Sequence, residues 1–77
     1  MNNEAKQVFR LKTYGRTELA LIYSPNLTPK GALARLNGWI RLYPGLEQQL
    51  KATGFKWSQR YFTPAQVSLI TEALGEP

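Results

Sequence analysis

The stretch TPKGALARLNGWIRLY, from Thr28 to Tyr43, decides the fold of this 77-residue chain. Thr28 followed by Pro29 is typical of an N-cap and the first position of a helix. At 100° per residue, apolar side chains fall on one arc and a polar stripe lies on the opposite side. The arc holds Ala32, Leu33, Leu36, Trp39, Ile40 and Tyr43, and the stripe holds Lys30, Ala34, Asn37 and Arg41. The pattern predicts a helix from about Pro29 to Leu42 with one buried face and one face free to bind a partner.

Two glycines, Gly31 and Gly38, lie between these faces. Each costs about 1 kcal/mol relative to alanine in a helix interior. Two interpretations stay open: another backbone approaches the helix closely at these positions, or the helix simply tolerates them.

Before this helix, the sequence predicts a strand, a first helix and a turn. Gln7 to Tyr14 alternates apolar and basic side chains, as a half-buried strand does. Gly15 can serve as the N-cap of a helix from about Arg16 to Tyr23. The segment Ser24–Leu27 is a turn, because Pro25 cannot continue a helix.

After it, the spacing of apolar residues predicts a short helix over Leu46–Thr53. The aromatic segments Phe55–Trp57 and Arg60–Phe62 then indicate a small hairpin, although Ser-Gln is a poor pair for a tight hairpin turn. Thr63-Pro64-Ala65-Gln66 is a capping box with proline at the first helical position, and it predicts a last helix that Gly75 ends.

A chain of this length forms one domain with a thin core. Four short helices, a short N-terminal strand and a small hairpin define a mainly α, α+β fold. The order helix, turn, helix, basic hairpin is that of a winged helix-turn-helix domain. We expect residues 1–6 to be disordered and residues 7–77 to form this single domain.

The residue types that are missing exclude most chemistry. The chain has no Cys, no His and no Asp, so it lacks every Cys or His nucleophile and base, the usual zinc ligand sets and disulfides. We therefore expect no enzyme, no cofactor and no small-molecule substrate. The apolar runs are too short to span a bilayer and the polar N-terminus is not a signal peptide, so we expect a cytoplasmic protein without membrane contact.

The net charge of +5 is concentrated in the middle of the chain. Residues 30–60 carry six cations and one glutamate, whereas residues 61–77 carry two glutamates and no cation. A basic block of this kind makes a polyanion the first partner to consider.

In a winged helix-turn-helix domain the second helix enters the major groove and the hairpin lies along the phosphates. Double-stranded DNA is accordingly the expected partner. The candidates for contact are the polar and basic side chains of the second helix and the hairpin turn: Lys30, Arg35, Asn37, Arg41, Lys56, Ser58, Gln59 and Arg60. Asn37 is suited to an adenine edge, and Arg35 or Arg41 to guanine or phosphate. For each of them, an ordinary solvated side chain is the alternative.

Two other interpretations stay open. Trp39, Trp57, Tyr61 and Phe62 either stack on bases of a single strand or simply cover a thin core. A different class of function is a protein-interaction module or small homodimer without nucleic-acid binding, in which the partner completes the core.

Several short motifs resemble one family. They are Tyr14-Gly15-Arg16-Thr17-Glu18-Leu19-Ala20, Ser24-Pro25, Thr28-Pro29, Trp39-Ile40, Ala52-Thr53-Gly54, Phe62-Thr63-Pro64, Gln66-Val67 and Leu74-Gly75-Glu76-Pro77. Over about residues 9–77 they resemble short proteins of gut anaerobic bacteria that form a domain of unknown function. More distantly, the run from Arg60 to Val67 is similar to MerR-type regulators and phage excisionases, and this resemblance implies DNA binding.

Overall fold

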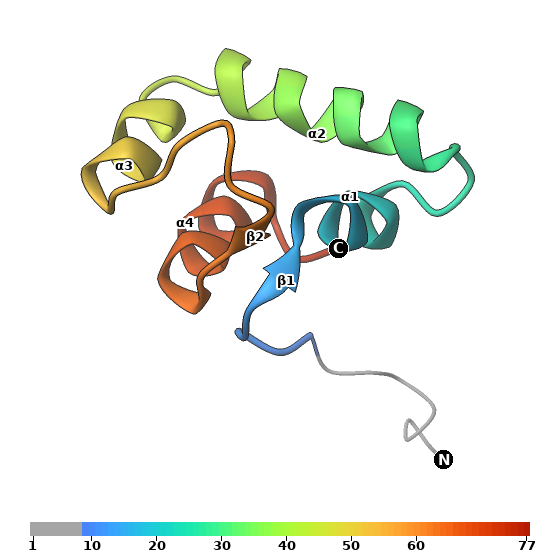
Figure 1. Ribbon diagram of the computed structural model, residues 1–77, viewed down its shortest axis with the longest axis horizontal. Helices are drawn as coiled ribbons and strands as arrows, with labels where there is room; N and C mark the ends of the chain where they lie inside the picture. The colour runs from blue at the N-terminus through green and yellow to red at the C-terminus, as the bar shows by residue number, and fades with distance from the viewer. Residues whose placement is uncertain (1–8) are drawn as a thin grey trace.

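The structure is a computed structural model that describes residues 9–77. These residues form four helices and two short strands (Figure 1). In chain order they are β1 (Tyr14–Gly15), α1 (Arg16–Tyr23), α2 (Pro29–Leu42), α3 (Leu46–Ala52), β2 (Tyr61–Phe62) and α4 (Pro64–Leu74). The mainly helical α+β class predicted from the sequence is confirmed. The disorder expected for residues 1–6 concerns a segment outside the described residues.

Local signals set the helix boundaries. The Thr28 hydroxyl accepts a hydrogen bond from the Gly31 amide at the start of α2. Thr63 and Gln66 form the predicted reciprocal capping box at the start of α4, with distances of 3.2 and 3.0 Å. At the end of α4, Gly75 adopts φ +89°, a conformation that side-chain-bearing residues avoid.

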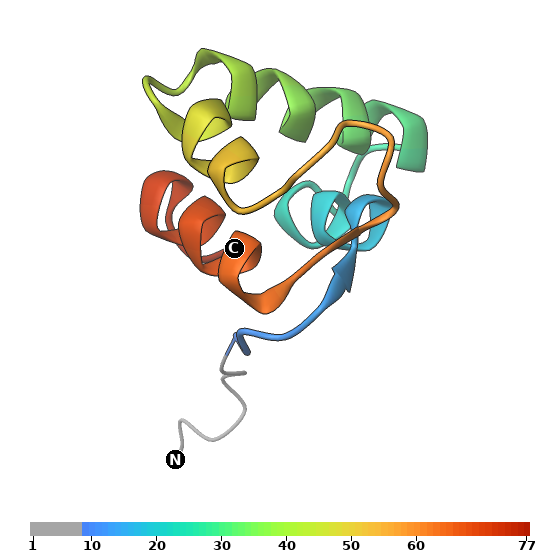
Figure 2. The same cartoon turned by 60° about the vertical axis from the view of Figure 1, so that its left-hand side comes forward.

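The core lies beneath α2 (Figures 1 and 2). α2 runs along one side of the molecule above α1 and α4, while α3 lies near the end of α2. Each helix contributes apolar side chains that are fully buried: Leu19, Leu36, Ile40, Leu46, Leu50, Val67 and Ile70, together with Phe62 of β2. The predicted buried arc of α2 is correct at its centre, but Tyr43 at its end is exposed.

The N-terminal strand is much shorter than the alternation predicted. Only Tyr14 of the expected Gln7–Tyr14 segment is in a strand, and residues 7–8 lie outside the described part. The Tyr14 hydroxyl donates to the Arg10 carbonyl, and the Phe9 and Tyr14 rings stack at 5.3 Å. The chain before β1 therefore folds back on Tyr14 instead of extending the sheet.

A small two-stranded antiparallel sheet is present, but its partners differ from the predicted hairpin. Tyr61–Phe62 pairs with Tyr14–Gly15, and Phe55–Trp57 is not a strand. Tight hairpin turns need residues that accept positive φ, and Ser58-Gln59 does not provide them. The segment Phe55–Arg60 instead forms an irregular connection, which we call the 55–60 loop.

Candidate nucleic-acid interface

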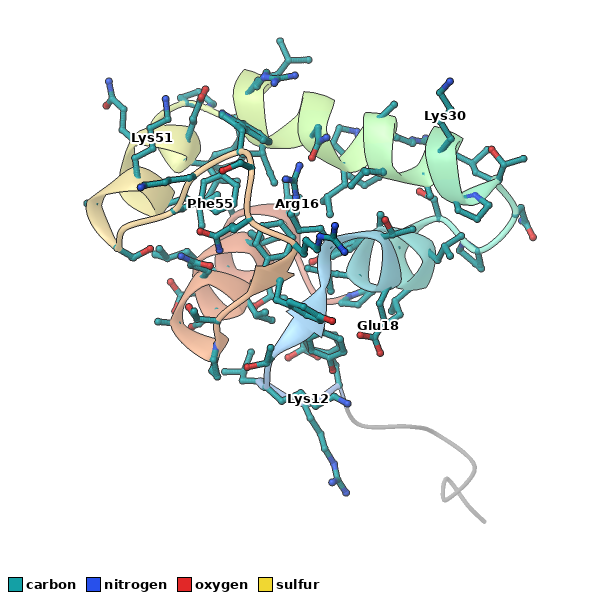
Figure 3. The ribbon with its side chains drawn as sticks, viewed as in Figure 1. Lys12, Arg16, Glu18, Lys30, Lys51 and Phe55 are labelled. Atoms are coloured by element: carbon teal, nitrogen blue, oxygen red, sulfur yellow. The ribbon has the colours of Figure 1, made fainter. Side chains whose placement is uncertain are left out.

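The 55–60 loop is held by Arg16, the first residue of α1. One terminal nitrogen of its guanidinium, Nη1, donates to the carbonyl oxygens of Trp57 and, at 3.1 Å, of Gln59. The other, Nη2, donates to Oδ1 of Asn37 on α2 at 2.9 Å. The Arg16 backbone amide also donates to the Arg60 carbonyl at 2.9 Å. A single side chain thus joins α1, α2 and the loop, and it lies at the centre of the molecule in Figure 3.

Aromatic rings surround this guanidinium. The centroids of Phe55, Trp57 and Phe62 lie 5.8, 5.3 and 5.9 Å from its central carbon, within cation–π range. Burial, and to a lesser extent the positive charge of Arg41, lowers the pKa of Arg16. An arginine stays charged at neutral pH all the same, so the loop is built on a permanent cation.

Trp57 links the loop to the end of α2 and to α3. The Arg41 guanidinium lies 4.3 Å from the Trp57 ring centroid. The indole nitrogen donates to Oε2 of Glu47 at 2.8 Å, and Nζ of Lys51 lies 3.3 Å from the same oxygen. The hydrogen bond from Trp57, and then that from Lys51, holds the pKa of Glu47 below its ordinary value. Trp57 is therefore fixed at both its ring and its indole nitrogen.

Gln59 organises the loop from within. Its Oε1 accepts from the Lys56 amide at 3.0 Å, and its Nε2 donates to the Tyr61 carbonyl at 2.7 Å and to Oε1 of Gln66 at 3.0 Å. Gln66 is buried and also donates to the Thr53 hydroxyl at 2.9 Å. The loop conformation is thus fixed by side-chain hydrogen bonds in place of a strand ladder.

Four of the eight predicted contact residues lie around the exposed surface of the loop. Lys56, Ser58 and Arg60 are exposed on the loop itself, and Arg41 is exposed beside Trp57. Two others, Asn37 and Gln59, are half-buried and have internal hydrogen-bond partners.

The last two predicted residues lie elsewhere. Lys30 is at the far end of α2, about 16 Å from Arg41 along the helix axis, and points away from the molecule in Figure 3. Arg35 lies on the other side of α2, where its guanidinium is 5.0 Å from the Trp39 ring centroid.

The periodicity predicted that the whole polar stripe of α2 faces solvent. In the structure only part of the stripe does so. Asn37 is turned toward Arg16 and Arg41 stacks on Trp57, so the outermost line of the helix passes through Ala34 and Gly38. A Cβ placed on Gly38 meets no atom within 4 Å, whereas one on Gly31 lies 3.1 Å from the Thr28 hydroxyl oxygen. Among the described residues, no backbone approaches Gly38 closely.

We call the two sides of α2 the loop flank and the tail flank. The loop flank carries Leu33, Asn37 and Arg41 and borders the 55–60 loop. The tail flank carries Arg35, Trp39 and Leu42 and borders the C-terminal residues 74–77.

Apart from Arg35, the tail flank is apolar. Trp39 meets Tyr23 edge-on at 6.1 Å, and the Tyr23 hydroxyl donates to the Gly75 carbonyl. Burial, and then the negative charge of Glu76, raises the pKa of Tyr23 to about 12. Leu42 projects beside this cluster with 82% of its surface exposed.

Sequence reasoning missed Arg16 and Glu47. Arg16 is separated from Trp57 by 41 residues, and Glu47 from Trp57 by 10. Neither partnership follows a helical or strand period, so no local pattern indicates it. Of the aromatic residues considered for base stacking, Phe62 is fully buried and Tyr61 is exposed.

Together these features define a small, mainly helical α+β domain with a basic, rigidly braced loop on one side of its longest helix. The chain belongs to the family described as Domain of unknown function (DUF4248), which matches residues 10–77. No curated protein and no solved structure matches the chain. None of the helices is long and apolar enough to cross a membrane within the described residues.

Proposed function

We propose that this protein binds duplex DNA through its phosphates, without strong preference for base sequence. The binding face consists of Arg41 on α2 and of Lys56, Ser58 and Arg60 on the 55–60 loop, with Lys30 at its edge. The observation that carries the proposal is the Arg16 network, which fixes the backbone of the 55–60 loop against α1 and α2. A loop fixed before binding loses little conformational entropy when it meets a ligand.

The inward orientation of Asn37 and Gln59 supports phosphate contact over base readout. The Asn37 amide that is suited to an adenine edge accepts a hydrogen bond from Arg16. Ala34 and Gly38, on the outermost line of the helix, carry no group that distinguishes bases. Contacts from arginine and lysine to phosphates carry no direct sequence information.

Three acidic residues of the described part of the chain, Glu18, Glu47 and Glu76, lie away from this face or are occupied. Glu47 is engaged by Trp57 and Lys51. Glu18 caps the start of α1 and points away from α2 in Figure 3, and Glu76 borders Tyr23 and Trp39. This charge separation favours a polyanion on the loop side. In this proposal the 55–60 loop takes the place of the wing of a winged helix-turn-helix domain. The proposal also places the protein in the cytoplasm.

Fluorescence anisotropy with a mixed-sequence duplex tests the proposal. If about four phosphates are neutralised, the log–log salt slope is about −3.6 and the affinity falls roughly a hundredfold from 50 to 200 mM salt. The double variant Arg41→Gln, Arg60→Gln lowers the slope to about −1.8. The matched control Lys12→Gln, Arg35→Gln removes the same charge from other surfaces and leaves the slope near that of the wild type.

A second duplex of unrelated sequence completes the test. Affinities within about threefold of each other support phosphate-based recognition. Absence of salt-sensitive binding at micromolar protein and low salt would remove the proposal, and equal loss in the control variant would show that only total charge matters.

A second candidate is a homodimer, favoured by the tail flank. Trp39, Leu42, Tyr43, Pro44 and Leu74 line an apolar pocket of about 260 Å³. A two-fold axis would place Leu42 of each copy in the pocket of the other. Light scattering at several concentrations tests this: a dimer that Leu42→Gln converts to a monomer supports it, and a monomer at all concentrations excludes it.

A further inference from the structure

A pocket of about 310 Å³ lies between the start of α1, the loop flank of α2 and the end of the 55–60 loop. Its lining residues come from all three segments: Arg16, Thr17, Leu33, Ser58, Gln59 and Arg60. The first and last of these are 44 positions apart in the chain, so the pocket is a product of the fold.

Apart from Leu33, the side chains that line the pocket carry hydrogen-bond donors, two of them are cations, and no carboxylate lines it. Thr17 and Ser58 bring hydroxyl groups, and Arg60 brings an exposed guanidinium. The Gln59 side chain is occupied by Tyr61 and Gln66, and both terminal nitrogens of Arg16 already donate to protein oxygens. The two hydroxyls and Arg60 are therefore the groups available as ligands. Planar guanidinium groups and hydroxyls are the side chains that suit a phosphate.

Arg16 supplies an independent observation. Among the described residues, its Nε is the buried side-chain nitrogen or oxygen that has no hydrogen-bond partner. A buried donor without an acceptor is costly, and native structures usually satisfy it with protein, water or a ligand. Since Arg16 lines the pocket, an anion seated there lies close to the permanent positive charge of its guanidinium, whereas the Nε atom itself is buried.

We propose that this pocket binds a single phosphate group, with Arg60, Thr17 and Ser58 as its ligands and Arg16 as the underlying cation. The proposal does not depend on duplex binding. The phosphate comes either from the backbone of a nucleic acid or from a free or terminal phosphomonoester, which share the same tetrahedral, anionic chemistry.

The site is tested by titrating ¹⁵N-labelled protein with inorganic phosphate while amide resonances are followed. The amides of Thr17, Ser58 and Arg60 should shift together and saturate. Arg60→Gln and Thr17→Val should each raise the dissociation constant for phosphate. We expect a rise of about tenfold for Arg60→Gln, because it removes the charged partner. Arg35→Gln removes one positive charge from the tail flank and should leave the dissociation constant for phosphate unchanged.

The spectra of the variants also show whether each remains folded. If Thr17→Val perturbs the fold, Ser58→Ala, at an exposed position, tests the same site. Shifts that fail to saturate, that spread over all basic residues, or that persist in Arg60→Gln would overturn the proposal.

A second set of measurements separates the two sources of phosphate. Identical duplexes with and without a 5′-phosphate are compared by anisotropy in the wild type and in Thr17→Val. Equal weakening of both duplexes by the variant assigns the pocket to the backbone. Tighter wild-type binding of the phosphorylated duplex, lost in the variant, assigns it to a terminal phosphate. Saturable phosphate binding without any duplex binding removes the proposed function and leaves the pocket in place.

Discussion

The two flanks of α2 use the same helix in opposite ways. On the loop flank, Asn37 and Arg41 connect to the 55–60 loop through a cation and hydrogen bonds. On the tail flank, Trp39 packs on Tyr23 and Leu42 is left exposed. Polar contacts fix orientation and direction, whereas apolar contacts fix only proximity. The comparison indicates that the loop flank is built for a defined arrangement of charges and the tail flank for cohesion.

The largest expected effect comes from removing the centre of the loop flank. Arg16→Ala deletes three side-chain hydrogen bonds to Asn37, Trp57 and Gln59 and leaves their oxygens without a donor. We expect a loss of about 3 kcal/mol in the free energy of unfolding, measured by urea denaturation.

Arg16→Lys sharpens this test because it keeps the charge and loses the planar fork. It should recover less than half of the loss. Full recovery by lysine would show that charge alone holds the loop, and the contrast between the flanks would then be one of charge, not geometry.

The next largest effect is expected at Gly38, which lies on α2 between the two flanks. There the substitution should raise the stability instead of lowering it. Gly38→Ala places a Cβ where no atom lies within 4 Å, and alanine is the better helix former. We expect the variant to be more stable by about 1 kcal/mol, visible as a higher Tm in thermal unfolding.

The same variant decides between the two interpretations of Gly38. If duplex affinity is unchanged while stability rises, the glycine is merely tolerated. If affinity falls, a ligand approaches the helix closely at this point. A lower Tm would contradict the open space around Gly38.

The sequence predicted most of the fold because helix ends are local. Thr28, Thr63 and Gly75 act within a few residues of themselves, and all three boundaries are confirmed. The sheet pairing was wrong because it joins Tyr14–Gly15 to Tyr61–Phe62 across most of the chain. Long-range pairing leaves no trace in local periodicity.

The same difference between local and long-range signals decides which residues of the candidate site could be predicted from the sequence. The basic residues of the loop could be found from charge and the turn, and Arg60 and Ser58 do share a pocket. The hydrogen bonds from Arg16 to the loop could not be predicted from the sequence, because a single arginine after a strand has no distinctive spacing. The inward turn of Asn37 follows from its own hydrogen bond with Arg16, so it was invisible for the same reason.

A smaller effect is expected on the tail flank. Tyr23→Phe removes the hydrogen bond to the Gly75 carbonyl and keeps the packing on Trp39. We expect a loss of about 0.5 kcal/mol at neutral pH, measured by urea denaturation.

The effect depends on pH in a defined direction. The pKa of Tyr23 is raised to about 12, from an ordinary value of 10.0. The contribution is therefore fully present below pH 10 and is lost as the pH rises toward 12. A difference between wild type and variant that persists at the top of this range would show that packing, not the hydroxyl, distinguishes them.

The smallest effect returns to the loop flank at low pH. The pKa of Glu47 is lowered by its hydrogen bonds from Trp57 and Lys51, so the ionised carboxylate is favoured in the folded protein. Its contribution is present above the ordinary glutamate pKa and is lost as the pH falls through the lowered value.

The indole N–H resonance of Trp57 should shift over that acidic range, while that of Trp39, on the tail flank, stays in place. Glu47→Gln should abolish the Trp57 titration without moving Trp39. Titration of both indoles together would mean that acid loosens the whole helix, and the two flanks would not be independent.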